Sequence, residues 1–142
     1  MTEKLDARAC ALIAARCASD KKAHDIVVQH VAEKLRETDY FVIATGMNKP
    51  QVNAVINDVR EKIREATGRS VESVEGAGTG DWVLLDYGDF VVHVMKPEAR
   101  DFYRLESVWN DAPFIDLAAE GIEVEEYSPA IAGVVAKAGY EE

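Results

Sequence analysis

Two carboxylates flank a predicted tight turn and could do chemistry together. Asp86 and Asp89 stand at the two ends of the segment Asp86-Tyr87-Gly88-Asp89, and they are the only paired carboxylates on adjacent predicted elements. Such pairs can hold two metal ions for phosphoryl or nucleotidyl transfer. Acidic residues at the ends of a turn more often accept hydrogen bonds from the turn's own backbone N–H groups. We therefore predict neither a catalytic residue nor a metal site here.

The other candidates for chemistry stand alone. His30 and His93 have no Cys, Asp or Ser at the spacing of a metal site or a catalytic triad. The glycine-rich segment 75–80 (EGAGTG) precedes a predicted strand and has no lysine, so it does not fit a phosphate-binding loop. Cys10 and Cys17 fall about 10.5 Å apart along one predicted helix, which is beyond disulfide reach. We predict small apolar roles for both cysteines and no bound cofactor.

A β-hairpin must position the two carboxylates. Residues 82–85 and 90–95 are valine-rich apolar runs, and Gly88 between them can adopt a positive φ without penalty. We centre the turn on Tyr87-Gly88, which places apolar side chains on one face of the sheet, the predicted core face. The cross-strand pairs on that face are then Leu85 with Phe90 and Val83 with Val92.

The second face of this hairpin carries an unusual pair. The same register places Trp82 opposite His93 and Leu84 opposite Val91, with Met95 beyond them. A large aromatic beside a titratable ring suggests a surface that binds a partner. Helices that cover both faces and bury Trp82 are the alternative, because large aromatics are usually mostly buried.

Periodicity and capping residues predict the remaining elements. Asn48 is a good helix N-cap, Gln51 can complete a capping box, and Gly68 provides a C-terminal stop. Predicted helices cover residues 4–18, 49–67 and 97–109, and predicted strands cover 25–31, 40–44, 70–74, 82–85 and 90–95. Two of the links between strands are too short for a helix, so we predict an α/β fold with a mixed β-sheet and flanking helices.

The last predicted helix starts at Pro97, where a missing N–H costs nothing. Phe102, Leu105 and Trp109 recur at intervals of three and four, which predicts a core stripe. Tyr103 falls on a neighbouring face of this helix.

Charge is unevenly distributed along the 142 residues, which are enough for one domain. Residues 1–109 hold 18 acidic and 15 basic residues, whereas residues 110–142 hold 8 and 1, within a total of −10. We therefore expect a loosely ordered acidic tail over 118–142, within which Ser128-Pro129 could cap a short apolar helix through Ala138. We expect no direct binding to nucleic acid, which requires clustered Lys and Arg. No apolar run is long enough to span a bilayer, and no signal peptide is evident, so we expect no membrane contact and a cytoplasmic location.

Four ordered blocks resemble a known family. They are TDYFVIATG (38–46), SVEG (73–76), GDWVLLDYGDFVVHVM (80–95) and PEARDFYRLESVW (97–109). Together they are similar to the ribosomal silencing factor family, also called Iojap-like, over a domain that we place at residues 1–117. The resemblance implies a nucleotidyltransferase-like α/β fold and a protein that is not an enzyme.

The resemblance also implies a function and a partner. Family members repress translation when nutrients run low, by binding ribosomal protein fourteen of the large subunit and blocking subunit joining. The resemblance leaves open a part in large-subunit biogenesis and the formation of a homodimer. We place the partner-binding site on the second hairpin face and the last helix. Its predicted residues are Trp82, Leu84, Asp86, His93, Met95, Arg100 and Tyr103.

Three alternatives remain at this point. Arg100 could instead lie on a solvated helix face with local ion pairs. A metal-dependent nucleotidyltransferase would use Asp86 and Asp89, although the turn at residues 45–48 has no serine after its glycine. A self-associating module would use the same exposed sheet face.

Overall fold

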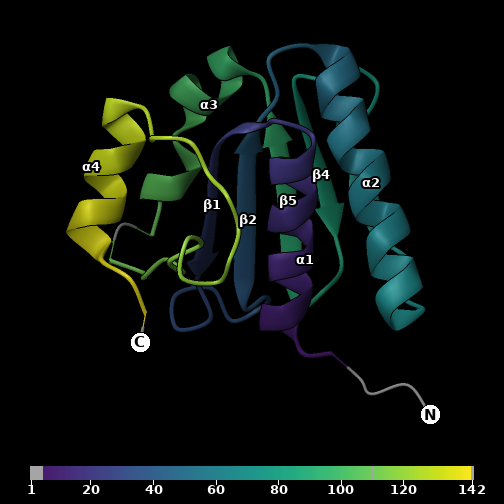
Figure 1. The fold of residues 1–142 in the computed structure, drawn as a ribbon, viewed down its shortest axis with the longest axis horizontal. Coiled ribbons are helices and arrows are strands. Elements are labelled where there is room, and N and C mark those ends of the chain that lie inside the picture. Colours follow the sequence, from purple (N-terminus) through teal and green to yellow (C-terminus); the bar gives the residue numbers. More distant parts are fainter. Residues whose placement is uncertain (1–4, 110, 142) are drawn as a thin grey trace.

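A mixed five-stranded sheet forms the centre of the computed structural model, which describes residues 5–109 and 111–141 (Figure 1). The strands lie in the order β1-β2-β5-β4-β3, with β2 and β5 parallel and every other pair antiparallel. This confirms the predicted α/β class, while the nucleotidyltransferase likeness stays a prediction. The elements are α1 (Ala7–Asp20), β1 (His24–His30), β2 (Tyr40–Thr45), α2 (Lys49–Thr67), β3 (Ser73–Glu75), β4 (Trp82–Asp86), β5 (Phe90–Met95), α3 (Pro97–Tyr103), the 3-10 helix η1 (Leu105–Ser107) and α4 (Pro129–Ala138).

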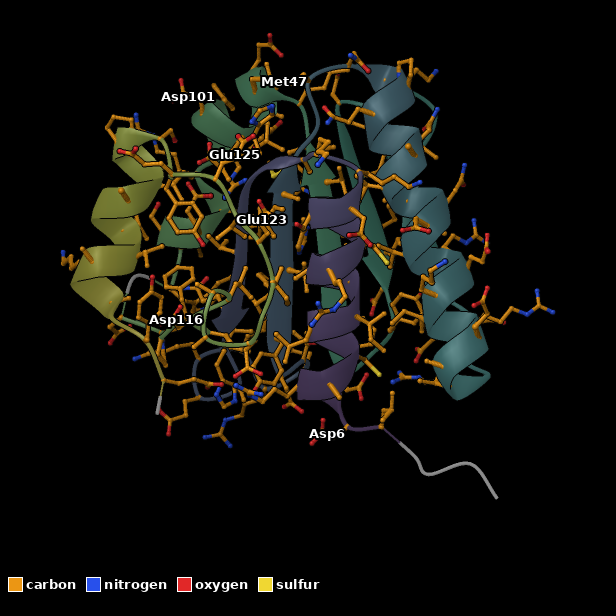
Figure 2. All side chains as sticks on the ribbon, viewed as in Figure 1. Asp6, Met47, Asp101, Asp116, Glu123 and Glu125 are labelled. Carbon is orange, nitrogen blue, oxygen red and sulfur yellow. The ribbon has the colours of Figure 1, made fainter. Side chains whose placement is uncertain are left out.

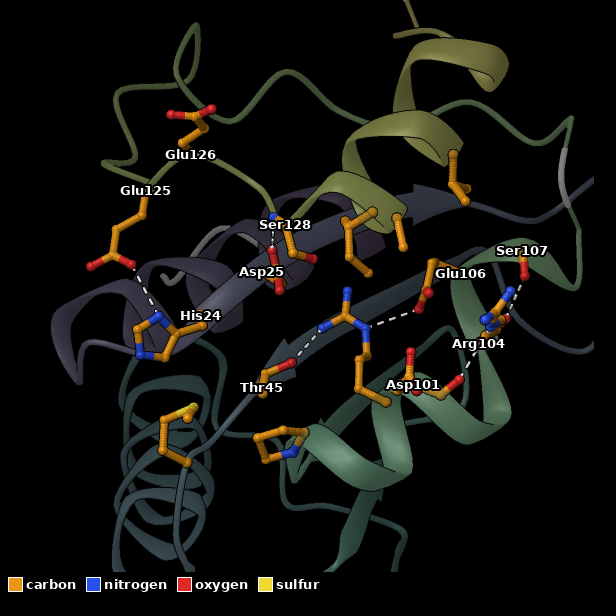
Figure 3. Close-up of a pocket in the computed structure, with 16 residues that line it drawn as sticks. His24, Asp25, Thr45, Asp101, Arg104, Glu106, Ser107, Glu125, Glu126 and Ser128 are labelled. Atoms are coloured by element: carbon orange, nitrogen blue, oxygen red, sulfur yellow. Dashed lines mark hydrogen bonds and ion pairs between the residues drawn. The ribbon is translucent and has the colours of Figure 1, made fainter.

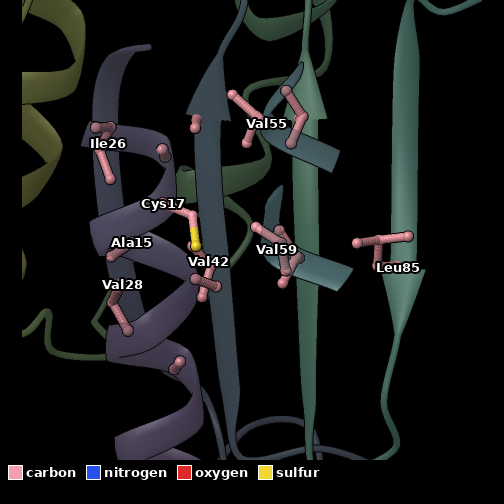
Figure 4. Packing of buried hydrophobic residues seen from close by; sticks show 14 of the residues in the cluster. Ala15, Cys17, Ile26, Val28, Val42, Val55, Val59 and Leu85 are labelled. Atoms are coloured by element: carbon pink, nitrogen blue, oxygen red, sulfur yellow. The ribbon is translucent and has the colours of Figure 1, made fainter. Parts of the chain in front are cut away.

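The first face of the sheet is covered by α1 and α2, which lie in front of it in Figure 1. The sheet-facing side of α1 is lined with buried alanines and both cysteines, and such small side chains let the helix approach the strands closely. Figure 4 shows Ala15 and Cys17 against Val28 and Val42 of the sheet. Cys10 and Cys17 are free and buried, as predicted. The predicted helix start at Lys4 lies outside the described residues.

Local capping sets the ends of α2. The Asn48 side-chain amide oxygen accepts a hydrogen bond from the Gln51 backbone N–H at 2.9 Å, and the Gln51 side-chain oxygen accepts one from the Met47 N–H at 2.7 Å. Gly68 ends the helix with a φ of 76°, a conformation that favours glycine. The predicted cap and stop are confirmed, with the reciprocal bond of Gln51 one residue earlier than in a standard capping box.

The hairpin turn lies one residue later than predicted. Gly88, with a φ of 89°, and Asp89 are its central residues, because the Tyr87 N–H donates to the Phe90 carbonyl at 3.0 Å. Side chains alternate along a strand with a period of two, so the resulting two-residue shift in pairing leaves every side chain on its predicted face. The observed pairs are Trp82 with Met95, Val83 with Val94, Leu84 with His93, Leu85 with Val92 and Asp86 with Val91.

The last predicted helix is shorter than its apolar pattern suggested. It ends at Tyr103 because Arg104 adopts a left-handed conformation with a φ of 47°, and η1 continues the chain at an angle. The prediction that one helix extends from 97 to 109 is therefore wrong. This early ending decides which side chains of α3 face the solvent.

The acidic composition of the C-terminal segment had predicted a loosely ordered tail, but the segment packs into both cores. Ile122 belongs to the first core beside α1, with Val124 packed against it. Phe114 forms bridges to Gln29 of β1 and to Tyr140, and α4 buries Ile131 and Val135 in the second core. The segment's acidic side chains face outward and several pair with basic residues of the body. The pairs are Arg8 with Glu120, Arg8 with Glu141, His30 with Glu141 and His24 with Glu125.

Candidate functional site

An aromatic surface lies where α3 ends beside β4. Phe102 is 78% exposed and Tyr103 is 53% exposed. Their rings meet edge to face with centroids 4.9 Å apart, and the Tyr103 ring lies 4.9 Å from that of the half-buried Trp82. Leu84 is also half-buried, one strand-face position along β4. We call Trp82, Leu84, Phe102 and Tyr103 the aromatic face.

Phe102 is the member of this face that sequence reasoning missed. Its spacing from Leu105 predicted a core position, and that prediction is wrong for Phe102, although Leu105 itself is buried. The left-handed Arg104 breaks the helical spacing between these two residues, so they no longer share a face. The pair Phe102-Tyr103 by itself gave no signal of this break, because adjacent helical residues can both be buried, as Val55 and Ile56 are in α2.

Trp82 is held in place by a buried histidine of the neighbouring strand β5. Its indole N–H donates a hydrogen bond to Nδ1 of His93 at 3.1 Å. His93 is 3% exposed, and burial, aided by the charge of Arg100, lowers its pKa to about 3. The imidazole is therefore neutral at physiological pH, and its Nδ1 is the acceptor that the indole needs. His93 orients the indole and is itself shielded from any partner.

Two other predicted site residues lie in the interior. Met95 is completely buried in the second core. Arg100 is 4% exposed, and its Nε donates to Glu106 and its Nη1 to Thr45, both at 2.9 Å (Figure 3). Burial lowers the pKa of Arg100, while the charge of Glu106 opposes that shift. The alternative of a solvated helix face is thus wrong for Arg100, and this residue, which we predicted in the partner-binding site, lies below the surface because its guanidinium finds its partners inside the fold.

The two carboxylates of the hairpin are both engaged. The Asp86 side chain accepts a hydrogen bond from the Gly88 N–H at 2.8 Å, which is the capping role expected at a turn. Asp89 forms an ion pair with Arg69 at 2.8 Å, and hydrogen bonding to that carboxylate raises the pKa of the Arg69 guanidinium. Within the part of the chain that the structure describes, no three His, Cys, Asp or Glu side chains gather in a way that could hold a metal ion.

The aromatic face borders a shallow cavity with polar edges. The cavity has a volume of about 670 Å³. Beside it, Asp81 forms an ion pair with Lys96 at 3.3 Å, and Glu98 at the start of α3 is exposed. An apolar centre with a charged rim is the usual anatomy of a protein-binding surface. The arrangement offers a partner an apolar surface bordered by charged groups, and the carboxylates are spread along the rim.

Comparison with known proteins gives this surface a context. Residues 4–136 match the family model described as ribosomal silencing factor during starvation. The chain belongs to the ribosomal silencing factor family. Its members are ribosome-associated regulators of translation. The match runs past residue 117, where the sequence resemblance had placed the end of the domain, so it includes most of the packed C-terminal segment.

Individual relatives agree with this assignment. The ribosomal silencing factor RsfS of Bacillus subtilis is 39% identical over 105 residues, which are 74% of this chain and 88% of that protein. The mouse protein named mitochondrial assembly of ribosomal large subunit protein 1 is 34% identical over 102 residues, 70% of this chain and 45% of that protein. A crystal structure from Chromobacterium violaceum superposes with a TM-score of 0.71 at 31% identity, covering 87% of this chain and 93% of the other.

None of the helices in residues 5–109 and 111–141 has both the length and the hydropathy that crossing a bilayer requires.

Proposed function

We propose that this chain represses translation by binding ribosomal protein fourteen of the large ribosomal subunit through the aromatic face. Occupation of that site leaves no room for the small subunit, so the two subunits cannot join. The action is steric, takes place in the cytoplasm and breaks no bond, and the chain has no catalytic role. Trp82, Leu84, Phe102 and Tyr103 form the contact, while His93, Met95 and Arg100 support it from the interior.

The exposure of Phe102 and Tyr103 is the observation that carries this proposal. Aromatic side chains usually supply most of the energy of a protein interface, and large ones rarely stay in water without a partner. These two lie on a helix that is fixed to the fold by the buried Arg100, and Tyr103 packs on Trp82. A surface held this rigidly loses little conformational entropy on binding.

The charge around the face supports a basic partner. Asp81, Lys96 and Glu98 lie at its rim, where Lys96 pairs with Asp81 and Glu98 remains as the exposed charge. The whole chain carries a net charge of −10. Acidic charge of this kind attracts lysine- and arginine-rich protein surfaces and repels the phosphates of exposed rRNA. The name of the mouse relative refers to assembly of the large subunit. That name supports the large subunit as the target and keeps a part in its biogenesis within the proposal.

Co-sedimentation with purified large subunits tests the proposal. Replacing Tyr103 or Trp82 by alanine is expected to weaken binding by at least about 2 kcal/mol, the lower limit for an interface hot spot. Tyr140→Ala is the matched control, because Tyr140 is 51% exposed but lies next to Phe114 at the β1 side of the sheet. Equal binding by a folded Tyr103→Ala protein would refute the contact.

A second measurement addresses self-association. If the aromatic face joins two copies of the chain, sedimentation velocity over a concentration series should show a dimer that Tyr103→Ala converts to a monomer. A monomer at all concentrations, combined with binding to large subunits, would assign the face to the ribosome alone.

A further inference from the structure

A second hollow lies on the opposite side of α3 from the aromatic face. It has a volume of about 550 Å³ and is enclosed by the end of β2, the start of β1, α3 and the start of α4 (Figure 3). Thr45 and Pro97 place it at the carboxyl ends of the parallel strands β2 and β5, where ligands of α/β proteins commonly bind. We call this hollow the groove. None of the residues of the aromatic face lines the groove.

The walls of the groove are largely apolar. Met47, Pro97, Ile131 and Val134 line it, and Met47 is an exposed large hydrophobic side chain. An unbranched, flexible methionine beside aliphatic side chains adapts well to the stems of long side chains. This part of the groove therefore suits hydrocarbon, such as the methylene groups of lysine or arginine.

Carboxylates dominate the rim. Five acidic residues and two arginines line the groove, and one of those acids, Glu106, is already paired with Arg100. Figure 2 shows Met47, Asp101 and Glu125 at the same end of the molecule. Asp101 and Glu126 are exposed, and neither forms an ion pair with any residue that the structure describes. This charge balance favours a cation and repels phosphate or a free carboxylate.

The buried guanidinium of Arg100 adds a second, independent requirement. Its Nε and Nη1 are paired, whereas Nη2 has no hydrogen-bond partner among the described residues. A buried N–H without an acceptor costs about 1–3 kcal/mol, and more for a charged group. Because the acidic rim repels anions, the acceptor that fits is a neutral oxygen, such as a carbonyl. Arg100 lines the groove, so an occupant that fills it to the floor can supply that oxygen.

We propose that the groove binds an extended, lysine- or arginine-bearing peptide segment of a partner protein. A peptide is the ligand class that combines a neutral carbonyl with a cation on an aliphatic stem. The stems lie against Met47 and Val134, the cationic heads pair with Asp101 and Glu126, and a main-chain carbonyl reaches Arg100. This site is separate from the aromatic face, so it stands whether or not that face binds the ribosome.

The test is an NMR titration of the full, ¹⁵N-labelled chain with two probes of equal charge. One probe is a capped tetralysine peptide, and the other is spermine, which carries four cationic groups but no carbonyl. Amide shifts should concentrate at residues lining the groove, and tetralysine should bind more tightly than spermine by at least about threefold, as one added hydrogen bond implies. Equal affinity for the two probes would overturn the role of Arg100.

Paired variants separate the groove from general attraction to an acidic protein. Asp101→Asn with Glu126→Gln should weaken tetralysine binding by about 2- to 30-fold, the range for loss of two exposed ion pairs. Glu61→Gln with Glu65→Gln makes the same charge change on the exposed surface of α2 and should weaken it by less than about twofold. Equal weakening by both pairs, or amide shifts that map elsewhere, would refute the proposal. Co-sedimentation of the Asp101→Asn, Glu126→Gln protein with large subunits tests the aromatic face separately from the groove.

Discussion

Phe102→Ala separates a docking residue from a core residue more sharply than any other single change. Helical spacing predicts that Phe102 belongs to the core, whereas the structure exposes 78% of it. The two readings give opposite expectations for stability and for binding. Both quantities can be measured on the same purified protein.

The expected loss of stability is small. Folding hides roughly a fifth of a side chain that presents about 200 Å². At about 25 cal/mol per Å², that area contributes about 1 kcal/mol, which is an upper limit because the unfolded chain is not fully extended. A phenylalanine buried in the core would instead lose about 3–5 kcal/mol on truncation to alanine.

The expected loss of binding is large. A partner that covers the remaining area of roughly 150 Å² gains about 4 kcal/mol before the costs of association are subtracted. We expect at least about 2 kcal/mol to be lost on truncation, which is a roughly 30-fold weaker affinity for large subunits. Urea unfolding measures the first quantity and co-sedimentation measures the second, with Tyr140→Ala as the control for an exposed aromatic elsewhere.

Two results would refute this reasoning. A stability loss of about 3 kcal/mol or more would show that Phe102 is packed in the fold. Unchanged affinity of a folded Phe102→Ala protein would show that the partner does not cover this ring.

The remaining predictions concern the interior that supports the face. Glu106→Gln removes the charge that compensates the buried Arg100, so urea unfolding should show a loss of about 3–5 kcal/mol, and a loss below about 1 kcal/mol would contradict the ion pair's role. His93 has its pKa lowered from 6.5 to about 3 by burial, so the unfolded chain binds the proton first as the pH falls. The stability due to neutral His93 is complete above pH 6.5 and declines below it, by up to about 1.4 kcal/mol per pH unit. The stability difference between the native protein and His93→Gln should therefore shrink between pH 7 and pH 5, and a constant difference would contradict the assignment.

The elements themselves were predictable because their signals are local. The cap at Asn48, the stop at Gly68 and the alternation of apolar residues in β4 and β5 each act through neighbours in the chain. The exposure of Tyr103 and the partial exposure of Trp82 are also compatible with the predicted partner-binding face, because that face was derived from the local periodicity of the strands and of the helix. A side chain's face on a strand survives a two-residue error in register, so the faces were right even though the turn was misplaced.

Burial was predicted less well because it depends on contacts between distant segments. Arg100 has a polar side chain that usually stays near water, and its neighbours in the chain do not indicate Thr45 and Glu106 as its partners. The hairpin pattern did place Trp82 beside His93, but it did not indicate that His93 is buried. The C-terminal segment packs more closely than its acidic composition predicted, because Ile122, Ile131 and Val135 join it to the two cores.

The sequence by itself determined the strands, the two main helices, the face that each hairpin residue occupies and the family to which its ordered blocks are similar. Only the tertiary structure decided that α3 ends at Tyr103, that Phe102 faces water and that three predicted contact residues lie beneath the surface. The physical reason is that capping and periodicity are stabilised by bonds between near neighbours in the chain. Exposure, in contrast, depends on which other segments pack against a side chain in the folded state. Here Glu106, Thr45 and the C-terminal segment cover one side of α3 and leave its aromatic end open.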